Sequence, residues 1–379
     1  MDYQISAYAV PDYDSGGMDA AVAAHLAAFG ISKLVTPETK IVLKPNLLMK
    51  RKPAMATTTH PALVAAVVRE LKRLGATDIT IADSPGGPYT KTLLEGIYRG
   101  CGMKQAADAG AKLNTAAGFA VVDAPDATLC RSFGIIDPIR GADLVINLPK
   151  LKTHALTGLS GAVKNLLGCV PGMQKPELHL RFSERRRFCR MLVELAQLVN
   201  PGFTIVDAVV SMEGEGPSAG TLRETGMTFA AKNPFALDLA LCEFAGISAK
   251  NVPTITVSQE LGLCPRDVFE LEYLGEKPLP VPDFIVPAFR TPNFSDRVPA
   301  PLRGAVMKLA GAFLEPRPVV KATECTGCGR CKKFCAAKAI EVAEGKAVID
   351  RGKCIRCFCC HEMCPTKSIG LKKAALFRH

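Results

Sequence analysis

Eight cysteines near the C-terminus repeat one spacing twice and constrain this chain more than any other feature. Each copy reads C-x2-C-x2-C-x3-C, and the second copy ends in Cys364-Pro365. Three thiolates at such short spacing can wrap one iron–sulfur cubane, while the fourth, beyond a turn, reaches the neighbouring cubane. The array therefore predicts two [4Fe–4S] clusters.

Zinc is the alternative metal for paired C-x2-C units, but zinc sites usually take their four ligands from two separated pairs. Here four cysteines crowd into each short copy, which suits a cubane and would strain a zinc tetrahedron. A ninth cysteine, Cys359, would break the repeat if it replaced Cys360. We therefore expect Cys359 to be a spare thiol.

This region resembles the bacterial two-cluster ferredoxins over residues 321–371. In these ferredoxins the fourth cysteine of each copy binds the other cluster. Each cluster therefore takes three cysteines from one copy and one from the other. Cluster 1 takes Cys325, Cys328, Cys331 and Cys364, and cluster 2 takes Cys354, Cys357, Cys360 and Cys335. The sequence departs from the family pattern at Ala336, where a proline usually follows the fourth cysteine.

Composition indicates a globular protein, with 48% hydrophobic and 22% charged residues over 379 positions. No stretch reaches the ~18 uninterrupted apolar residues of a membrane span, and no basic segment precedes an apolar run at the N-terminus. The remaining cysteines are scattered, unlike a secreted disulfide framework. We therefore expect no membrane span, a reducing compartment and a cytoplasmic location, with most scattered cysteines buried. Cys169, close to a basic segment, is the one of interest.

The net charge of +11 is concentrated around the clusters. Residues 321–379 hold 13 Lys/Arg against 5 Asp/Glu, so this region carries +8 of the total. Two clusters with four thiolates each are anionic, which favours charge compensation over a surface for an acidic partner or nucleic acid. A run of five arginines within residues 181–190 is interpreted as a solvated face.

The first 274 residues alternate short β-branched runs with amphipathic stretches. Strands are predicted at residues 41–43, 78–82, 119–122, 144–147 and 203–206, and helices at 61–74, 92–99 and 235–244. This rhythm predicts an α/β fold with a mostly parallel sheet and flanking helices, followed by a small α+β two-cluster ferredoxin-like domain. The predicted boundaries are 1–274 for the α/β domain, 275–320 for a proline-rich connector with a short amphipathic helix at 302–314, and 321–379 for the cluster domain.

Polar residues follow the predicted strands, at the edge where parallel sheets bind ligands. Lys44 and Asn46 follow the first of these strands, and Lys150, Lys152 and His154 follow the strand at 144–147. Residues 150–154 are interpreted as a basic loop, solvated or cradling an anion, that leads into a helix at 156–167 carrying Lys164 and Asn165. The glycine-rich segment 211–217 lacks the Lys-Ser/Thr ending of a phosphate-binding loop.

Together these residues define a candidate anion site. Lys44, Asn46, Lys150 and Asn165 would bind a small anion, and Lys152, Lys164 and His154 would act in catalysis, with His154 as the proton donor. Asp83, Asp207, Glu213 and Asp238 could serve as bases or hold a divalent metal.

Residues 1–290 resemble DUF362, a domain family of unknown function that commonly appears fused to a two-cluster ferredoxin module. The resemblance is carried, in order, by Lys44-Pro45-Asn46, Thr59-His60-Pro61, Lys150-x-Lys152-Thr153-His154, Lys164-Asn165-x-x-Gly168, Asp207, Glu213-Gly214-x-Gly216-Pro217 and Asp238. It implies the domain arrangement and no established reaction.

Three hypotheses about function follow from the sequence. The leading one is an iron–sulfur oxidoreductase that passes electrons to an anionic substrate or cofactor in the α/β domain. The second is an electron carrier or adaptor whose large domain docks a partner enzyme, the basic cluster region then facing an acidic redox protein. The third is a regulator that senses through its clusters, although no DNA-reading helix is evident.

Overall fold

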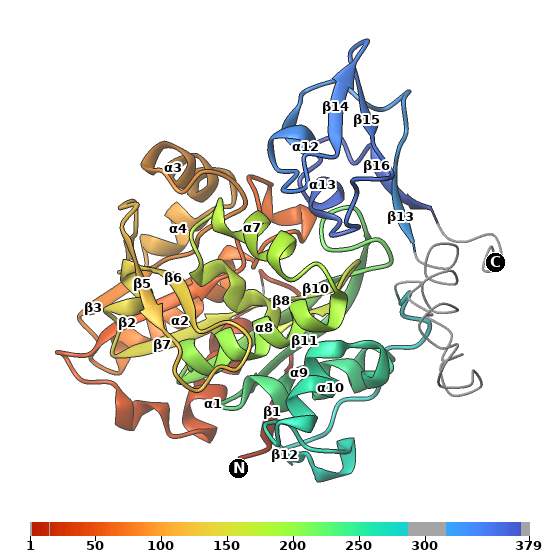
Figure 1. Cartoon of the computed structure of the whole chain (residues 1–379). Coiled ribbons are helices and arrows are strands. Elements are labelled where there is room, and N and C mark those ends of the chain that lie inside the picture. The colour runs from red at the N-terminus through yellow and green to blue at the C-terminus, as the bar shows by residue number, and fades with distance from the viewer. Residues whose placement is uncertain (1, 15, 287–315, 373–379) are drawn as a thin grey trace.

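The computed structural model describes residues 2–14, 16–286 and 316–372, which form a large α/β domain and a small cluster domain (Figure 1). The large domain is built on a ten-stranded sheet whose main path runs β12-β1-β11-β10-β7-β2-β3-β4. The strands β8 and β9 extend from β10, off this path.

The parallel part of the sheet is the part that the sequence predicts best. Strand β2 (Lys40–Pro45) lies between β3 (Asp78–Ile81) and β7 (Leu144–Leu148), parallel to both, and β3 continues to the short β4 (Lys112–Leu113). The predicted strands at 41–43, 78–82 and 144–147 are confirmed.

The other half of the sheet contains antiparallel pairs, and the predicted strand at 203–206 is confirmed there as part of β10. Strand β10 (Phe203–Glu213) runs parallel to β7 but antiparallel to β11 (Thr221–Ala231), which pairs antiparallel with β1 (Gln4–Ala9). The short β12 (Glu272–Leu274) joins the outer edge, parallel to β1. The fold is therefore a mostly parallel, mixed sheet with helices.

Helices cover both faces of the sheet because the buried strands alternate their side chains between two cores. On β2, Ile41 and Leu43 pack into one core and Val42 into the other. The first core contains α1 (Gly17–Ala28), α2 (Pro61–Arg73), α3 (Lys91–Gly100) and α4 (Met103–Ala107). The second contains α8 (Arg185–Val199), α9 (Pro234–Phe244) and α10 (Pro253–Glu260).

Residues 119–122 form the predicted strand, β5 (Phe119–Asp123), but it pairs antiparallel with β6 (Ser132–Ile136) in a hairpin outside the main sheet. The predicted helix at 156–167 is instead β9 (Gly158–Ser160) followed by the one-turn α6 (Ala162–Asn165). Gly158 has a φ of 86°, a left-handed conformation that interrupts a helix.

The segment at 150–154 is strand β8 (Lys150–His154) and not a solvated loop. It pairs with β10 in parallel and with β9 in antiparallel orientation, and all five residues are buried. Two lysines and a histidine are therefore held inside the protein.

The cluster domain consists of two similar halves. Strand β13 (Arg317–Val320) pairs with β16 (Ile369–Lys372), and β14 (Ile340–Ala343) pairs with β15 (Lys346–Ile349). One-turn helices α12 (Arg330–Lys333) and α13 (Cys359–Glu362) each follow the first cysteines of one motif. The helix predicted at 302–314 lies outside the described residues, and the domain boundaries stay a prediction.

The cluster domain meets the α/β domain through its second cysteine motif, while the β14–β15 hairpin points away from the large domain (Figure 1). Ser218 donates a hydrogen bond of 2.9 Å to the carbonyl oxygen of Glu362, and Arg51 donates one of 2.9 Å to the carbonyl oxygen of Pro365. Each of these contacts joins a loop of the large domain to the region around α13.

Candidate functional site

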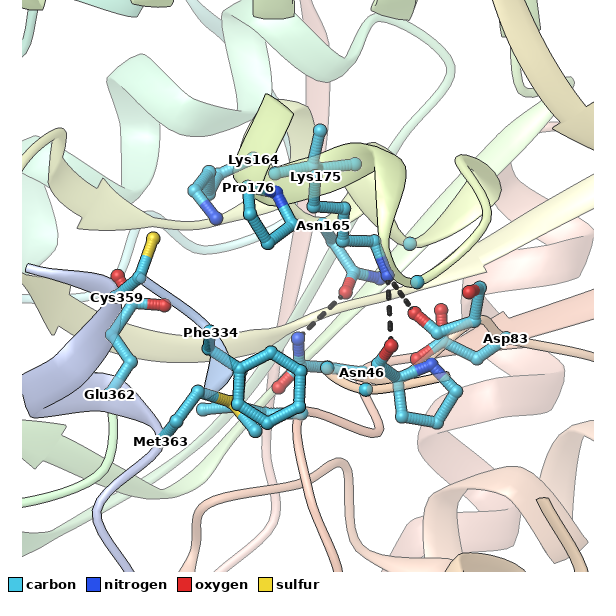
Figure 2. A pocket seen from close by; sticks show the side chains of 18 of the residues that line it. Asn46, Asp83, Lys164, Asn165, Lys175, Pro176, Phe334, Cys359, Glu362 and Met363 are labelled. Atoms are coloured by element: carbon cyan, nitrogen blue, oxygen red, sulfur yellow. Dashed lines mark hydrogen bonds between the residues drawn. The ribbon is translucent and has the colours of Figure 1, made fainter. Parts of the chain in front are cut away.

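A pocket of about 670 Å³, partly open to solvent, lies between the two domains. The α/β domain contributes the ends of β2 and β3, the one-turn helix α6, and α7 (Gln174–Arg181). The cluster domain contributes four side chains, Phe334, Cys359, Glu362 and Met363 (Figure 2). We call this pocket the interdomain cavity.

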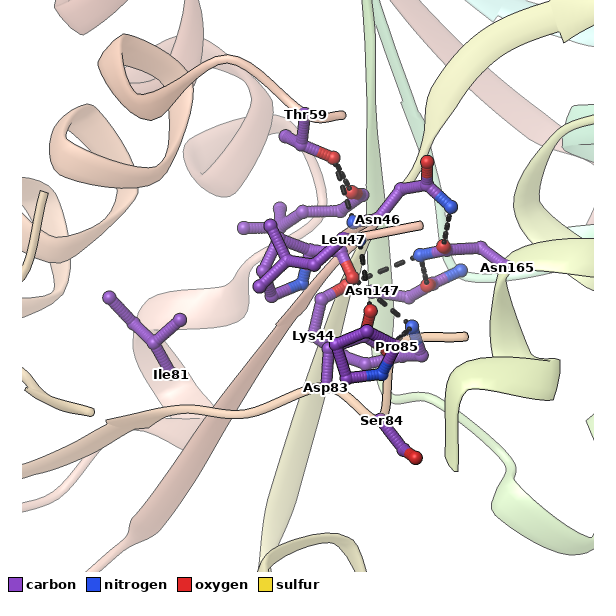
Figure 3. A network of polar contacts seen from close by, with 12 residues as sticks. Lys44, Asn46, Leu47, Thr59, Ile81, Asp83, Ser84, Pro85, Asn147 and Asn165 are labelled. Carbon is purple, nitrogen blue, oxygen red and sulfur yellow. Dashed lines mark hydrogen bonds and ion pairs between the residues drawn. The ribbon is translucent and has the colours of Figure 1, made fainter. Parts of the chain in front are cut away.

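One end of the interdomain cavity is closed by a buried ion pair. Lys44 Nζ lies 2.7 Å from Asp83 Oδ1, and Asp83 Oδ2 accepts a hydrogen bond of 2.9 Å from the backbone N–H of Leu47 (Figure 3). A Cβ atom at Gly168 would overlap both side chains, so glycine is required there. The charge of Lys44 is therefore neutralised by Asp83.

A chain of amides forms the adjoining wall. Asn46 donates a hydrogen bond of 2.9 Å to Asn165, and Asn165 donates one of 2.8 Å to Asn147. This fixes the orientation of the Asn46 carbonyl oxygen, which accepts a hydrogen bond of 2.7 Å from Lys152. Asn46 and Asn165 line the cavity, whereas Lys152 lies behind them.

Among the residues that the structure describes, no carboxylate pairs with the buried amine of Lys152. Its second hydrogen bond, 2.7 Å long, goes to the carbonyl oxygen of Thr57. The pKa of Lys152 is lowered to about 7, first by burial and then by the nearby Lys164 and Lys150, while Glu362 and Asp83 oppose the shift. Its role in the geometry is to orient Asn46.

Lys150 belongs to a separate network away from the cavity lining. Its Nζ lies 2.9 Å from Asp207 Oδ2 and donates a hydrogen bond of 2.6 Å to the hydroxyl of Tyr13. Tyr13 in turn donates to Asp207 Oδ1 and stacks on His60, with ring centroids 3.6 Å apart. The network holds the start of the chain against β10.

His154 lies behind Glu362 and does not line the cavity. Its Nδ1 accepts hydrogen bonds from the backbone N–H groups of Leu156 and Thr157, at 3.0 and 3.2 Å, so the proton of the neutral ring sits on Nε2. Burial lowers the pKa of His154, and the neighbouring Glu362 opposes this shift. The Nε2 atom lies 3.1 Å from Glu362 Oε1.

Glu362 is the member of this pair that faces the cavity. Burial raises the pKa of its carboxyl, but the contributions of His154 and Lys164 together outweigh burial and leave the pKa below its ordinary value. Although Nε2 and Oε1 are close, they are not aligned as a hydrogen bond, and both atoms are buried without another hydrogen-bond partner in the described residues.

Lys164 is the cation best placed for an anion. Its amine lies on the same side of the cavity as Cys359 and Glu362 (Figure 2). Within the ranges that the structure describes, no hydrogen bond or ion pair within 4.0 Å engages Lys164. An ammonium group without a partner in a half-enclosed cavity favours a negatively charged ligand.

The structure adds cavity residues that sequence reasoning missed. Lys175 donates hydrogen bonds to the carbonyl oxygens of Ser84 and Pro85, and burial lowers its pKa to about 7. His179 stacks on Phe188 with centroids 4.1 Å apart, and burial lowers its pKa to about 3. The Oγ of Ser84 and the Nδ1 of His179 are buried without a hydrogen-bond partner in the described part of the chain. No motif marks α7, so only the fold reveals these groups.

The four acidic candidates do not converge on one site. Asp238 accepts hydrogen bonds from the N–H groups of Ala162 and Val163 at the start of α6, whereas Glu213 accepts one from Ile285. Asp83 and Asp207 each pair with a different lysine. Among the described residues, no group of three or more His, Cys, Asp and Glu side chains is arranged to hold a single metal ion.

The eight spaced cysteines line two small hollows instead. One hollow is lined by Cys325, Cys328, Cys331 and Cys364. The other is lined by Cys335, Cys354, Cys357 and Cys360. The structure therefore brings together the same two sets of four cysteines that the sequence assigns to the two clusters.

Hydrogen bonds to sulfur support each hollow. The backbone N–H of Ala347 lies 3.5 Å from Cys325 Sγ, and that of Ala339 lies 3.2 Å from Cys335 Sγ. Ser368 Oγ lies 3.2 Å from Cys364 Sγ. Such bonds stabilise thiolate charge and raise the reduction potential of a bound cluster.

The remaining thiols differ in position. Cys359 lines both the second hollow and the interdomain cavity. Cys169 is buried, and burial raises its pKa to about 12, so it stays protonated.

In the described part of the chain, no helix is both long and apolar enough to cross a membrane.

Comparisons with known proteins cover both domains. Residues 41–243 match the family described as "Domain of unknown function (DUF362)", and residues 317–365 match a 4Fe-4S dicluster domain. A thylakoid-associated protein of Synechocystis sp. is 31% identical over 261 residues, which are 67% of this chain and 78% of that protein.

Similarity to solved structures is weaker. The lactate racemase apoprotein of Thermoanaerobacterium thermosaccharolyticum matches 64% of this chain with a TM-score of 0.41 and 13% identity, and the match spans 57% of that protein. A Thermotoga maritima protein matches 54% of this chain and 55% of its own length, with a TM-score of 0.31 and 13% identity.

Proposed function

Because this chain belongs to the DUF362 family and ends in a 4Fe-4S dicluster domain, we propose that it is an iron–sulfur oxidoreductase that reduces a small anion in the interdomain cavity. The dicluster domain holds two [4Fe–4S] clusters, which supply electrons one at a time. The protein's own residues bind the anion, orient it and exclude water.

A single observation carries this proposal: one cavity has walls from both domains. Lys164, Asn46 and Asn165 come from the α/β domain, and Cys359 and Phe334 come from the cluster domain. An anion bound to Lys164 would therefore lie next to a wall that also borders a cluster hollow. A carrier that only docked other proteins would have no need of a cavity with a lysine and two asparagines in its wall.

The residue roles follow from the positions of the side chains. Lys164 would balance the negative charge of the substrate, and Asn46 and Asn165 would donate or accept hydrogen bonds. Lys152 would position Asn46, and Lys44 would hold the cavity end in place through Asp83. His154 would keep Glu362 in position, a supporting role in place of the direct proton transfer expected from the sequence.

The test uses the holoprotein, purified and reduced without oxygen. Small carboxylates and phosphates are added one by one, and reoxidation of the clusters is followed by absorbance while mass spectrometry identifies the reduced product. We expect one anion class to reoxidise the clusters rapidly in the wild type and at least tenfold more slowly in Lys164→Gln. Lys91→Gln, which alters an exposed lysine on α3, is the matched control.

An electron carrier is the second candidate, because Cys328 is exposed and Arg330 and Lys333 lie exposed beside it. If no small anion reoxidised the clusters, while an acidic redox protein did so in a salt-dependent manner, the carrier function would replace the oxidoreductase.

A further inference from the structure

The two cluster hollows differ in their relation to the interdomain cavity. Cys359 lines both the cavity and the cluster 2 hollow, whereas the cluster 1 hollow and the cavity share no lining residue. We propose that electrons enter the cavity from cluster 2, across the wall formed by Cys359, and that cluster 1 receives electrons from a donor protein at the surface. This order of electron flow rests on the proposed function and deepens it.

The cavity wall on the cluster 2 side is tightly packed. Phe334 directly precedes Cys335, lines the cavity and is buried. It forms a small apolar cluster with Met49 and Met363, which closes this side of the cavity to water. Dry, packed protein between a cluster and its acceptor keeps their separation fixed and leaves the electrostatic interactions across the wall unscreened.

The surroundings of cluster 1 have the opposite character. Cys328 is the exposed cysteine of the eight, and it lies in a loop where Gly327 and Gly329 take left-handed conformations. Gly327 packs so closely on the carbonyl of Gly345 that a side chain would collide with it. The loop therefore brings a cluster ligand to the surface, where a low-potential donor protein can approach it.

Charge favours the same direction of flow. Arg330 and Lys333, exposed on α12 beside Cys331, suit an acidic donor protein at the surface. Lys164 stands at the other end of the path, in the cavity, on the side of Cys359. Positive charge at this end stabilises the electron as it arrives on the acceptor.

The electron balance is simple. Each electron taken from the donor protein at the Cys328 surface oxidises that donor by one electron, and each electron that leaves past Cys359 reduces the anion by one. No atom is transferred between protein and substrate in this step.

The test is a redox titration of the holoprotein followed by electron paramagnetic resonance, which requires no turnover. Cys328→Ser and Cys360→Ser assign the two cluster signals, because each changes a ligand of one cluster. In Lys164→Gln, we expect the midpoint potential of cluster 2 to fall and that of cluster 1 to stay unchanged. In Arg330→Gln, we expect a smaller fall, at cluster 1 only, because water and salt screen this exposed charge.

The order would be overturned if Lys164→Gln shifted the potential of cluster 1, of both clusters equally, or of neither. The proposed function fails in a different way. If Lys164→Gln shifts the midpoint potential of cluster 2 alone but no anion is reduced, cluster 2 is identified as the cluster that faces the cavity. Substrate reduction is then rejected. If anions are reduced but Lys164→Gln changes the midpoint potential of cluster 1, the proposed function stands and the proposed order of electron flow is wrong.

Discussion

The Nε2 atom of His154, on strand β8 of the α/β domain, lies 3.1 Å from Oε1 of Glu362, on helix α13 of the cluster domain. Both side chains are buried, so the contact couples a pair of polar groups across the junction of two domains. This contact explains why His154, which the sequence predicts to be catalytic, lies behind Glu362 and does not line the cavity.

Glu362→Gln should weaken this junction. The substitution keeps the shape of the side chain but removes the charge beside His154 and Lys164, and we expect a loss of about 1–3 kcal/mol in the free energy of unfolding. Anaerobic denaturant unfolding of the holoprotein measures the loss. Glu341→Gln, which alters an exposed glutamate paired with Lys332, should change stability by less than about 0.5 kcal/mol.

Lys152 should make stability depend on pH. Its pKa in the folded protein is about 7, below the ordinary value of 10.5 for a lysine, so the unfolded chain binds the extra proton between these two pH values. Stability should therefore rise from pH 7 towards pH 10, by up to about 1.4 kcal/mol per pH unit from this group. Unfolding at several pH values checks this.

In Lys152→Met, the rise with pH should be smaller than in the wild type, because the titrating amine is gone. Lys175, whose pKa is also about 7, titrates in the same window, so part of the slope should remain. An identical slope in the wild type and in Lys152→Met would show that Lys152 is not a depressed amine.

Cys359 and Cys360 are neighbours with different expected roles. Cys359→Ala should retain the iron and sulfide content of two clusters, because Cys359 falls outside the repeated spacing. Cys360→Ala should lose or alter cluster 2, because it removes a predicted ligand. Iron and sulfide analysis with spectroscopy of both variants is the check; a cluster lost from Cys359→Ala would make Cys359 a ligand.

Gly168→Ala should disturb the buried end of the cavity. A Cβ atom there meets Asp83 and Lys44, neither of which can move without breaking their ion pair. We expect a loss of about 1–3 kcal/mol in the free energy of unfolding. Gly96→Ala is the matched control, because nothing lies within 4 Å of the added atom in helix α3, and it should leave stability equal or raise it.

Removal of the clusters should unfold the small domain before the large one. The core of the cluster domain consists mostly of cysteines that face the hollows, with few apolar side chains such as Ile340 and Ile369. Without the clusters these cysteines lose their common partner. Hydrogen exchange after anaerobic chelation should show rapid exchange across residues 317–372, with slow exchange kept in β2, β7 and β10.

The sequence predicts best where a local pattern determines structure. The parallel strands around β2 were predictable because their buried runs are bounded by turns, and helix α2 because Pro61 and its apolar stripe mark it clearly. The antiparallel strands β11 and β1 could not be predicted, because their pairing joins residues about 220 positions apart. Such partners leave no local signal.

The same limit applies to the site. Lys44, Asn46, Lys164 and Asn165 do line the cavity, since the ends of neighbouring parallel strands meet. For Lys150, Lys152 and His154 the sequence predicts a loop, because three polar side chains in five residues suggest exposure. Pairing with β10 and β9 buries them instead. Lys175 and His179 depend on the packing of α7 and carry no motif.

The walls of the interdomain cavity come from separate domains, so binding of the ligand would depend on intact clusters. Oxygen that destroys the clusters would loosen the small domain and so remove Phe334, Cys359 and Glu362 from the cavity. A bound molecule would then be released into the solvent, unreduced. Conversely, a molecule that fills the cavity would contact walls from both domains at once.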